Sequence, residues 1–515
     1  MSGFTSLGKK SSGGFGGGGG TNSNAIGPFG TAIVSNLTPA AQAAFTYGTV
    51  PNSLLWVTQS SGIGALVSTS EAVMTCSSGA SVSGSSTVEL SRFIRYRAGQ
   101  GVVCRLTSIF DAGSTDTRQL AGAGNKESGY YFGRVGTNFG ILHRETSKRE
   151  IRTFTVTAQN AVTVTVTLAG EKKTFAINGG SNANQTAYLI SQADYTQIGS
   201  GWSSEALGNT VYFISTAPGP WTGTFDITVS GVTIVSATGT VQAGVLPTDT
   251  FITQSLWNID TMDGNGPSRT VLDPSKGNIY GIGYQYLGFG DPVFCIENPE
   301  TGLLTDVHRI QTANSKTTVV VRNPQMSARW VAENSGSSAT NVSVKGASAG
   351  IFNEGVVTRN IGVASAASAS KTSIGATAVP VLTIRANKVF ASQCCYGGLD
   401  IAEMSLSCDA GSSAGNKILK ILVYKNALLG GPVNFTSTDS RSFVSVDTSA
   451  TSFSTNGLTQ LMKTILVAAN SSVTIQLEDL GFFLTSGETL TIVAQRGASS
   501  DVDAALVSVG WFEDQ

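Results

Sequence analysis

The sequence is poor in charge and in histidine. Asp, Glu, Lys and Arg together make up 13% of its 515 residues, against roughly 25% in an average soluble domain. Only two histidines occur, and the formal net charge is −1. Without a basic excess to neutralise phosphates, we expect no binding to nucleic acid. Helix surfaces usually draw on Glu, Lys, Gln and Arg, so the scarcity of charge also disfavours a helical protein.

Long apolar runs are absent as well. No run approaches the roughly 18 residues that a membrane-spanning helix requires, so we expect no insertion into a membrane. Lys9 and Lys10 near the N-terminus are followed by a Gly/Ser tract, where a secretory signal peptide would have an apolar segment. The sequence therefore predicts synthesis in a cytoplasm, with no signal peptide and no export by the standard route.

Cysteine is sparse, and none of the six forms a C-x-x-C pair. A zinc site or a disulfide-dense scaffold is therefore disfavoured, and we expect neither a metal nor a cofactor. In a strand, the adjacent Cys394 and Cys395 would point to opposite faces, which argues against a disulfide between them. We expect six reduced, buried thiols that pack as small apolar side chains. They are Cys76, Cys104, Cys295, Cys394, Cys395 and Cys408.

Glycine is abundant, with 61 residues, and so are the small polar and β-branched residues that suit pleated sheets. Residues 130–144 alternate bulky and small side chains about a turn at Gly136, which predicts a hairpin. Residues 162–168 alternate Val with Thr and predict a strand, whereas residues 183–196 form the one plausible helix. Residues 385–515 hold short apolar runs separated by Gly and Ser, a rhythm typical of a sandwich or jelly roll. The predicted fold class is all-β and multidomain.

No catalytic motif emerges from the sequence. His143 and His308 lie in neither a G-x-S-x-G nor an H-E-x-x-H motif, and we interpret both as structural. A carboxylate pair for glycoside hydrolysis could be drawn from Asp260, Asp263, Glu297, Asp306 and Glu354. Because the chain has 33 acidic residues, such a set can always be assembled and carries little weight. We expect a protein that is not an enzyme, with polysaccharide degradation as a minor alternative.

One loop brings several oxygen ligands together. Asp260, Asp263 and Asn265 lie close in the sequence, but their spacing does not match an EF-hand loop. The Asn265-Gly266 dipeptide is typical of a turn. Two interpretations stay open, a hydrogen-bonded turn and a calcium site, and the turn is favoured.

Four aromatic residues form the one candidate ligand-binding group. They are Tyr280, Tyr284, Tyr286 and Phe289. Aromatic rings can stack on the apolar faces of sugars, so the group could line a glycan-binding face. The three tyrosines also share the parity of one strand face, which is typical of core packing. Both interpretations stay open, and core packing is favoured.

The stretch from Trp257 to Gly290 resembles a segment of structural virion proteins, tail-fibre-like or capsid-associated, of tailed phages and large algal DNA viruses. Its matching elements are the Asp263–Pro267 turn (DGNGP), Leu272–Lys276 (LDPSK) and Tyr284–Gly290 (YQYLGFG). The upstream element is Phe132–Ile141 (FGRVGTNFGI), and the downstream elements are Val307-His308, Asn323-Pro324 and Glu333–Gly336 (ENSG). The likeness covers about residues 85–150 and 251–360, with a looser match over 380–515.

The resemblance implies lectin-like jelly-roll β-sandwiches and an insertion that splits the first of them. The expected order is a flexible Gly/Ser-rich arm over 1–45 and a jelly-roll-like sandwich from 46–150 plus 251–360, with a small strand-rich (α+β) insert at 151–250. A linker over 361–384 and a C-terminal β-sandwich over 385–515 complete the chain. The resemblance supplies no catalytic residues.

The expected function is therefore that of a virion structural protein on the outside of a virus particle. It would be capsid-associated or belong to a vertex or fibre, and would act in assembly and surface display. Its expected partners are itself, as a homotrimer by family habit, and other virion structural proteins. The alternative is a receptor- or glycan-binding fibre protein that attaches to host surface glycan.

Overall fold

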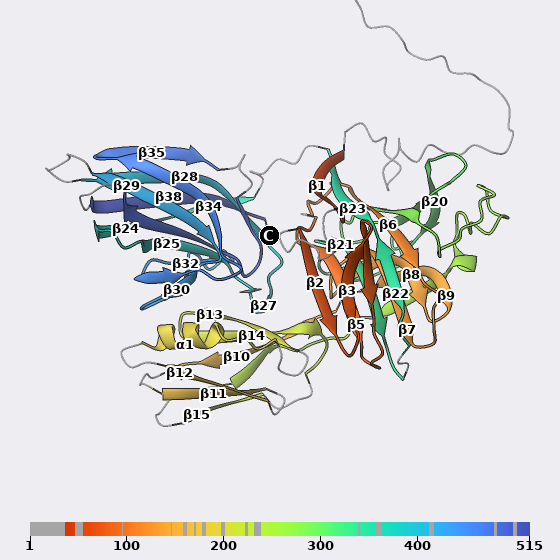
Figure 1. Ribbon diagram of the computed structural model, residues 1–515, viewed down its shortest axis with the longest axis horizontal. Coiled ribbons are helices and arrows are strands. Elements are labelled where there is room, and N and C mark those ends of the chain that lie inside the picture. Colours follow the sequence, from red (N-terminus) through yellow and green to blue (C-terminus); the bar gives the residue numbers. More distant parts are fainter. Residues whose placement is uncertain are drawn as a thin grey trace, which may run out of the picture.

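The computed structural model confirms the all-β, multidomain fold class (Figure 1). It describes residues 37–46, 55–94, 96–145, 147–157, 162–168, 171–177, 182–196, 201–221, 225–230, 238–337, 340–355, 362–410, 417–477, 482–497 and 502–514. Within these ranges the helices are α1 (Ala183–Ser191) and a 3-10 turn at Gln254–Leu256. Neither is long and apolar enough to span a bilayer.

Two antiparallel sheets face each other in the first sandwich, at the right of Figure 1. One sheet contains β1 (Leu37–Ala44), β3 (Leu66–Ser70), β4 (Val73–Ser77), β6 (Val102–Phe110), β18 (Asn278–Tyr284), β19 (Val293–Glu297), β20 (Leu304–Arg309), β22 (Ser343–Gly346) and β23 (Ser348–Glu354). The other contains β2 (Trp56–Ser61), β5 (Ser85–Leu90), β7 (Thr117–Gly124), β8 (Gly129–Val135), β9 (Asn138–Arg144), β17 (Asp249–Thr253) and β21 (Ser327–Asn334).

Period-two alternation builds the core between these sheets. Along β6, every second residue from Val102 to Phe110 is buried, and the residues between them are partly exposed. Phe132 of the facing sheet packs on Tyr280, with ring centroids 4.8 Å apart. The predicted hairpin at 130–144 is confirmed as β8 and β9, and Gly136 adopts a φ of 61° in the turn, a conformation that favours glycine.

The end of the expected N-terminal arm belongs to this sandwich. The arm was expected over residues 1–45, but β1 pairs antiparallel with β23 from Leu37 opposite Glu354 to Ala44 opposite Ser348. Residues 1–36 lie outside the described part of the chain. The prediction of a flexible arm is therefore wrong for the segment that forms β1.

The chain between β9 and β17 builds two small sheets. One contains β10 (Arg149–Thr155), β13 (Trp202–Leu207), β14 (Thr210–Pro218) and β16 (Thr238–Gln242), and the other β11 (Val162–Leu168), β12 (Glu171–Ile177) and β15 (Phe225–Ser230). The strand predicted at 162–168 is confirmed as β11. The helix is confirmed from Ala183 but ends at Ser191, because the Asp194 carboxylate accepts the Thr196 N–H at 2.9 Å and closes a turn instead.

The C-terminal sandwich, at the left of Figure 1, again has two antiparallel sheets. The first contains β24 (Val363–Ile374), β28 (Gly398–Asp409), β35 (Ser471–Gln476), β36 (Phe483–Leu484) and β38 (Val502–Asp514). The second contains β25 (Val379–Ala386), β29 (Ile418–Lys425), β31 (Thr436–Ser437), β32 (Val444–Asp447), β34 (Gln460–Ala468) and β37 (Thr489–Arg496). Two short pairs flank them, β26 (Val389–Phe390) with β27 (Gln393–Cys394) and β30 (Leu428–Gly430) with β33 (Ser452–Ser454).

The predicted linker at 361–384 is wrong. Most of that segment is β24, which pairs with β38 along its whole length, and the rest enters β25. Its composition of Ala, Ser and Thr suggested a linker because it offers little bulk of its own. The bulk comes from neighbouring strands, so the inward Ala367 and Ala369 pack against a core that includes Trp511.

The insert and the C-terminal sandwich share a core. Phe435 and Leu429 of the C-terminal sandwich join the buried cluster around α1. The Tyr188 hydroxyl in α1 accepts the Leu429 N–H at 3.1 Å. The insert therefore packs on the C-terminal sandwich, beneath it in Figure 1, although the chain enters and leaves the insert from the first sandwich.

Limited proteolysis distinguishes a strand from a linker at 361–384. Trypsin should cut native protein after Arg441, whose side chain is 89% exposed in a loop, well before it cuts after Lys371 in β24. Lys371 should resist because cleavage there requires β24 to leave its pairing with β38. Mass spectrometry of the first fragments checks this, and early cleavage at Lys371 would contradict the strand assignment.

Candidate functional site

The candidate glycan-facing aromatics lie mainly in the core of the first sandwich. Tyr280 and Tyr284 are each 1% exposed, and Tyr286 is 9% exposed. The Tyr284 hydroxyl donates to the Pro324 carbonyl at 3.3 Å, and burial raises the pKa of Tyr286 to about 12. The glycan-face interpretation is therefore wrong for the three tyrosines, and the core interpretation is right. Phe289, at 40% exposed, is the one member at the surface.

The Asp260 loop is a hydrogen-bonded turn, as favoured from the sequence. The buried Asp260 carboxylate accepts the N–H groups of Met262 and Ser268 at 2.8 and 2.7 Å. Asp263 accepts the Asn265 N–H at 2.9 Å, and this bond is the main cause that lowers the pKa of Asp263. Within the described ranges, no group of three or more His, Cys, Asp or Glu side chains is placed to hold a metal ion.

Both histidines are buried. His143 stacks on Tyr130 with centroids 5.0 Å apart, and burial lowers the pKa of His143 to about 4. His308 accepts the Asn258 N–H at Nδ1, 3.1 Å away, and burial lowers its pKa as well. Both imidazoles therefore pack as neutral groups in the first sandwich. Of the other candidate acids, Glu297, Asp306 and Glu354 lie on β19, β20 and β23 respectively.

The expectation of reduced cysteines is confirmed. All six are free thiols; five are buried and Cys295 is partly buried. Burial raises the pKa of Cys104 and Cys395 to about 12, so these groups stay protonated at neutral pH and are poor nucleophiles.

One carboxylate joins all three domains. Glu127 lies in the β7–β8 turn of the first sandwich, where the Asn125 side chain accepts the Glu127 N–H at 2.8 Å. Its buried carboxylate accepts hydrogen bonds from Arg149 Nε at the start of the insert and from the Tyr396 hydroxyl of the C-terminal sandwich. We call this cluster of Glu127, Arg149 and Tyr396 the triple joint.

A second buried charge cluster connects the insert to the C-terminal sandwich. Glu205 of β13 accepts the backbone N–H groups of Lys388 and Val389, each at 2.8 Å. In return, the Arg385 guanidinium donates to the Ala206 carbonyl at 2.7 Å and lies 3.9 Å from the centroid of the Phe435 ring. Burial lowers the pKa of Arg385, although Glu205 opposes this effect. We call this cluster the double joint.

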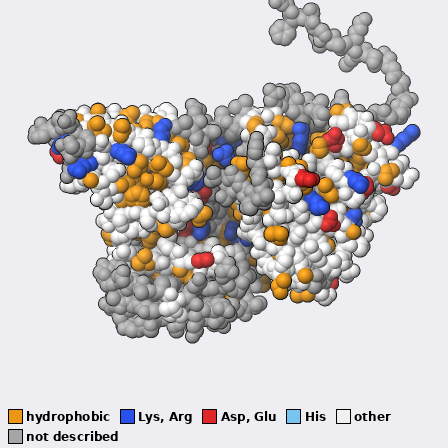
Figure 2. Space-filling view, viewed as in Figure 1, with side chains coloured by type: hydrophobic (Ala, Val, Ile, Leu, Met, Phe, Trp, Pro, Cys, Tyr) orange, Lys and Arg blue, Asp and Glu red, His pale blue; other side chains and the backbone are white. Residues whose placement is uncertain are grey.

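A cleft of about 390 Å³ lies at the triple joint and is lined by all three domains. Glu89 and Gln325 come from the first sandwich, Arg149 and Ser203 from the insert, and Lys388 and Ser486 from the C-terminal sandwich. Basic side chains are visible in Figure 2 where the three domains meet. Sequence reasoning did not find this cleft, because its residues lie in segments far apart in the chain and share no motif.

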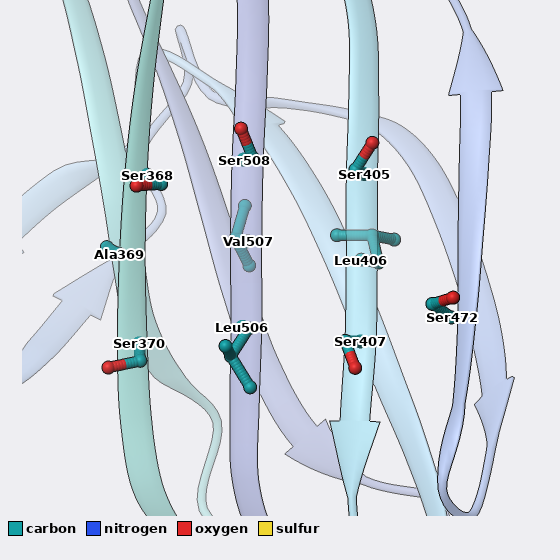
Figure 3. A pocket seen from close by; sticks show the side chains of 10 residues that line it. All are labelled: Ser368, Ala369, Ser370, Ser405, Leu406, Ser407, Ser472, Leu506, Val507 and Ser508. Carbon is teal, nitrogen blue, oxygen red and sulfur yellow. The ribbon is translucent and has the colours of Figure 1, made fainter.

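The outer face of β24, β38, β28 and β35 presents a second, shallower depression of about 420 Å³ (Figure 3). One cross-strand row holds Ser368, Ser508, Ser405 and Thr474. The next row holds Ser370, Leu506, Ser407 and Ser472. Leu506, at 46% exposed, projects from an otherwise small-residue, hydroxyl-lined surface. Small hydroxyl-bearing side chains of this kind leave room for close packing against another protein.

No family model matches the sequence, and neither does any curated protein. Several solved structures are similar. The carbohydrate recognition domain of Emp47p is 12% identical with a TM-score of 0.25, over 62% of this chain and 97% of that chain. Lectin II from Ulex europaeus is 10% identical with a TM-score of 0.21, over 62% and 100%. A triple-jelly-roll turret protein of an archaeal virus is 8% identical with a TM-score of 0.16, over 94% and 98%. Scores this low leave the function to be argued from the chain's own residues.

Two substitutions separate core from surface in the aromatic group. Changing Tyr284 to Ala should lower the free energy of unfolding by about 3 to 5 kcal/mol, the range for truncating a buried aromatic ring. Changing Phe289 to Ala should lower it by less than about 1 kcal/mol, because that ring is already partly in water. Urea unfolding followed by circular dichroism measures both. Equal losses would contradict the burial described here.

Proposed function

We propose that this chain is a structural protein on the outer surface of a virus particle, where it acts in assembly and display. The observation that carries the proposal is that three β-domains are locked into one arrangement by the triple joint and the double joint. A particle component must hold its neighbours at fixed positions, and a rigid multidomain body meets this requirement.

The chemistry of the joints explains the rigidity. Domains that close around ligands move about a few hinge residues across interfaces that separate easily. Here, partial separation would break the hydrogen bonds that the Glu127 carboxylate accepts from Arg149 and Tyr396, and the bond that Arg385 donates to the Ala206 carbonyl. The shared core around Phe435 and Tyr188 opposes separation further.

The surface suits extensive protein contact. Figure 2 shows few charged side chains on the visible face, in agreement with the composition. The hydroxyl-lined face around Leu506 is one candidate contact for another subunit. In this proposal the partners are further copies of the chain, in a homotrimer, and other proteins of the same kind of particle related to those of tailed phages and large algal DNA viruses. Catalysis has no part in it.

A second candidate function is attachment to a host glycan. The cleft at the triple joint favours it, because its lining combines amides, hydroxyls, charges and the partly exposed rings of Phe93 and Tyr396. Glycan sites on proteins commonly combine polar groups of this kind with an aromatic surface.

Immunogold electron microscopy of purified particles tests the location. An antibody raised against residues 385–515 should label intact particles. Label over the whole shell indicates a capsid or decoration protein, and label at a vertex or fibre tip indicates attachment. Label that appears only after the particles are disrupted would contradict an outer location, and the absence of label in both preparations would contradict the proposal itself.

The double joint gives a test of rigidity. Changing Glu205 to Ala should lower the free energy of unfolding by about 3–5 kcal/mol, because it leaves the Arg385 guanidinium buried without a carboxylate. Amide hydrogen exchange should increase in β13 and around Lys388, whose N–H groups lose their acceptor. Changing Asp439 to Ala is the matched control, since its partner Arg441 is exposed, and should leave unfolding unchanged. An unaffected Glu205 variant would show that the joint does not hold the domains.

A further inference from the structure

The lining of the cleft at the triple joint has two cationic side chains, Arg149 and Lys388, and one carboxylate, Glu89. Other charged groups act on the lining from around the cleft. The cations among them are Lys126, Arg329 and Arg385, and the carboxylates include Glu127, Glu205 and Glu513. The lining itself therefore has one more cation than carboxylate.

The pKa values of Lys126 and Lys388 respond to the neighbouring cations. Burial lowers the pKa of Lys388, and Arg385 and Arg149 lower it further, although Glu205 opposes them. Burial likewise lowers the pKa of Lys126, with Arg329 and Arg149 acting in the same direction against Glu89. An anion bound in the cleft would raise the pKa of both lysines and so oppose the effect of the neighbouring cations.

Lys388 is placed to meet such an anion. Its backbone N–H is used by Glu205, the residue lines the cleft, and its ammonium group donates to the Ser204 carbonyl at 3.0 Å. That bond uses one of the three donors of an ammonium group. Arg149, in contrast, is held by Glu127 in the triple joint. The Lys388 side chain is therefore the charged donor best able to bind a ligand without breaking a joint.

The rest of the lining is suited to hydroxyl groups. The Gln325 Oε1 atom is buried and accepts no hydrogen bond from the described residues. Asn323, Ser203 and Ser486 add amide and hydroxyl groups. The ring of Phe93 is fixed at one side by an edge contact with Phe483, with centroids 6.1 Å apart. A free phosphate would use the charge and leave the amides, hydroxyls and aromatic ring without a role.

We propose that this cleft binds an acidic saccharide, a sugar that carries a carboxylate, with Lys388 facing the carboxylate and Gln325 accepting from a sugar hydroxyl. The volume of about 390 Å³ lies at the lower end of the range for small-ligand pockets. The inference rests on the proposed surface location, because a cell-surface glycan reaches only an exposed protein. The three domains then act together as a receptor-binding unit.

Titration of the full-length protein with glucuronate, followed by NMR of the sugar or by calorimetry, tests the proposal. Glucuronate should bind, and glucose, which has the same ring without the charge, should bind at least about tenfold more weakly. Inorganic phosphate should not compete at equal concentration. No binding of glucuronate would overturn the proposal, and equal binding of phosphate would reduce the cleft to a simple oxyanion site and overturn it too.

Two variants locate the binding. Changing Lys388 to Gln should weaken glucuronate binding roughly tenfold or more. It removes the ammonium bond to the Ser204 carbonyl but keeps the Glu205 bonds of the double joint, because Glu205 contacts backbone N–H groups. Changing Gln325 to Leu should also weaken glucuronate binding, because the sugar hydroxyl loses its acceptor while the charge of Lys388 remains. Changing the exposed Lys276 to Gln is the matched control and should have no effect. Wild-type affinity in a folded Lys388→Gln variant would overturn the assignment.

The outcome is separable from the proposed function. A protein that labels the particle surface but does not bind glucuronate would refute the saccharide site alone. A protein that binds glucuronate but is missing from particles would refute the surface location and leave the site intact.

Discussion

The arrangement of the three domains depends on the hydrogen bonds to one buried carboxylate, that of Glu127. The insert leaves and re-enters the first sandwich beside this residue, where the two connecting segments bridge through Lys148 and Val245. Arg149 follows directly on that bridge, so its bond to Glu127 fixes the direction in which the insert projects. Tyr396 then brings the C-terminal sandwich to the same carboxylate. Because one group accepts from two other domains, a change in the position of either domain disturbs the contact of the other.

Buried charge fixes orientation in a way that apolar packing does not. An apolar interface tolerates small rotations, whereas a desolvated carboxylate loses much of its stabilisation when a donor moves out of hydrogen-bond geometry. In the double joint, Glu205 reaches across to the C-terminal sandwich, and Arg385 reaches back to the Ala206 carbonyl. These reciprocal bonds specify one register between the two domains, and the shared apolar core around Phe435 supplies burial without specifying it.

The sequence predicts what depends on local pattern. Alternation identified β11 and the β8–β9 hairpin, and the spacing of polar residues identified the turn at Asp260. Prediction from the sequence failed where a residue's environment is formed by distant segments of the chain. The segment at 361–384 has the composition of a linker, yet it is a strand because β38 lies beside it. The parity of Tyr280 and Tyr284, in contrast, favoured core packing, and the rings of Phe132 and Tyr130 on the facing sheet confirm it. In the triple joint, Arg149 lies 22 positions from Glu127 in the sequence, and Tyr396 lies 269 positions from it. No sequence motif predicts such a contact.

The two cations that line the cleft, Arg149 and Lys388, are costly for folding, since like charges in a partly dry environment repel one another. Glu205 offsets this repulsion at Lys388, because it attracts the ammonium group and also accepts the backbone N–H of Lys388. Like charges held close together in this way are typical of a functional site. A bound carboxylate would neutralise part of the excess and stabilise the native state by mass action. The contacts that join the three domains and the cationic side chains of the cleft thus come from the same segments, so a change in the position of one domain would also change the proposed saccharide site.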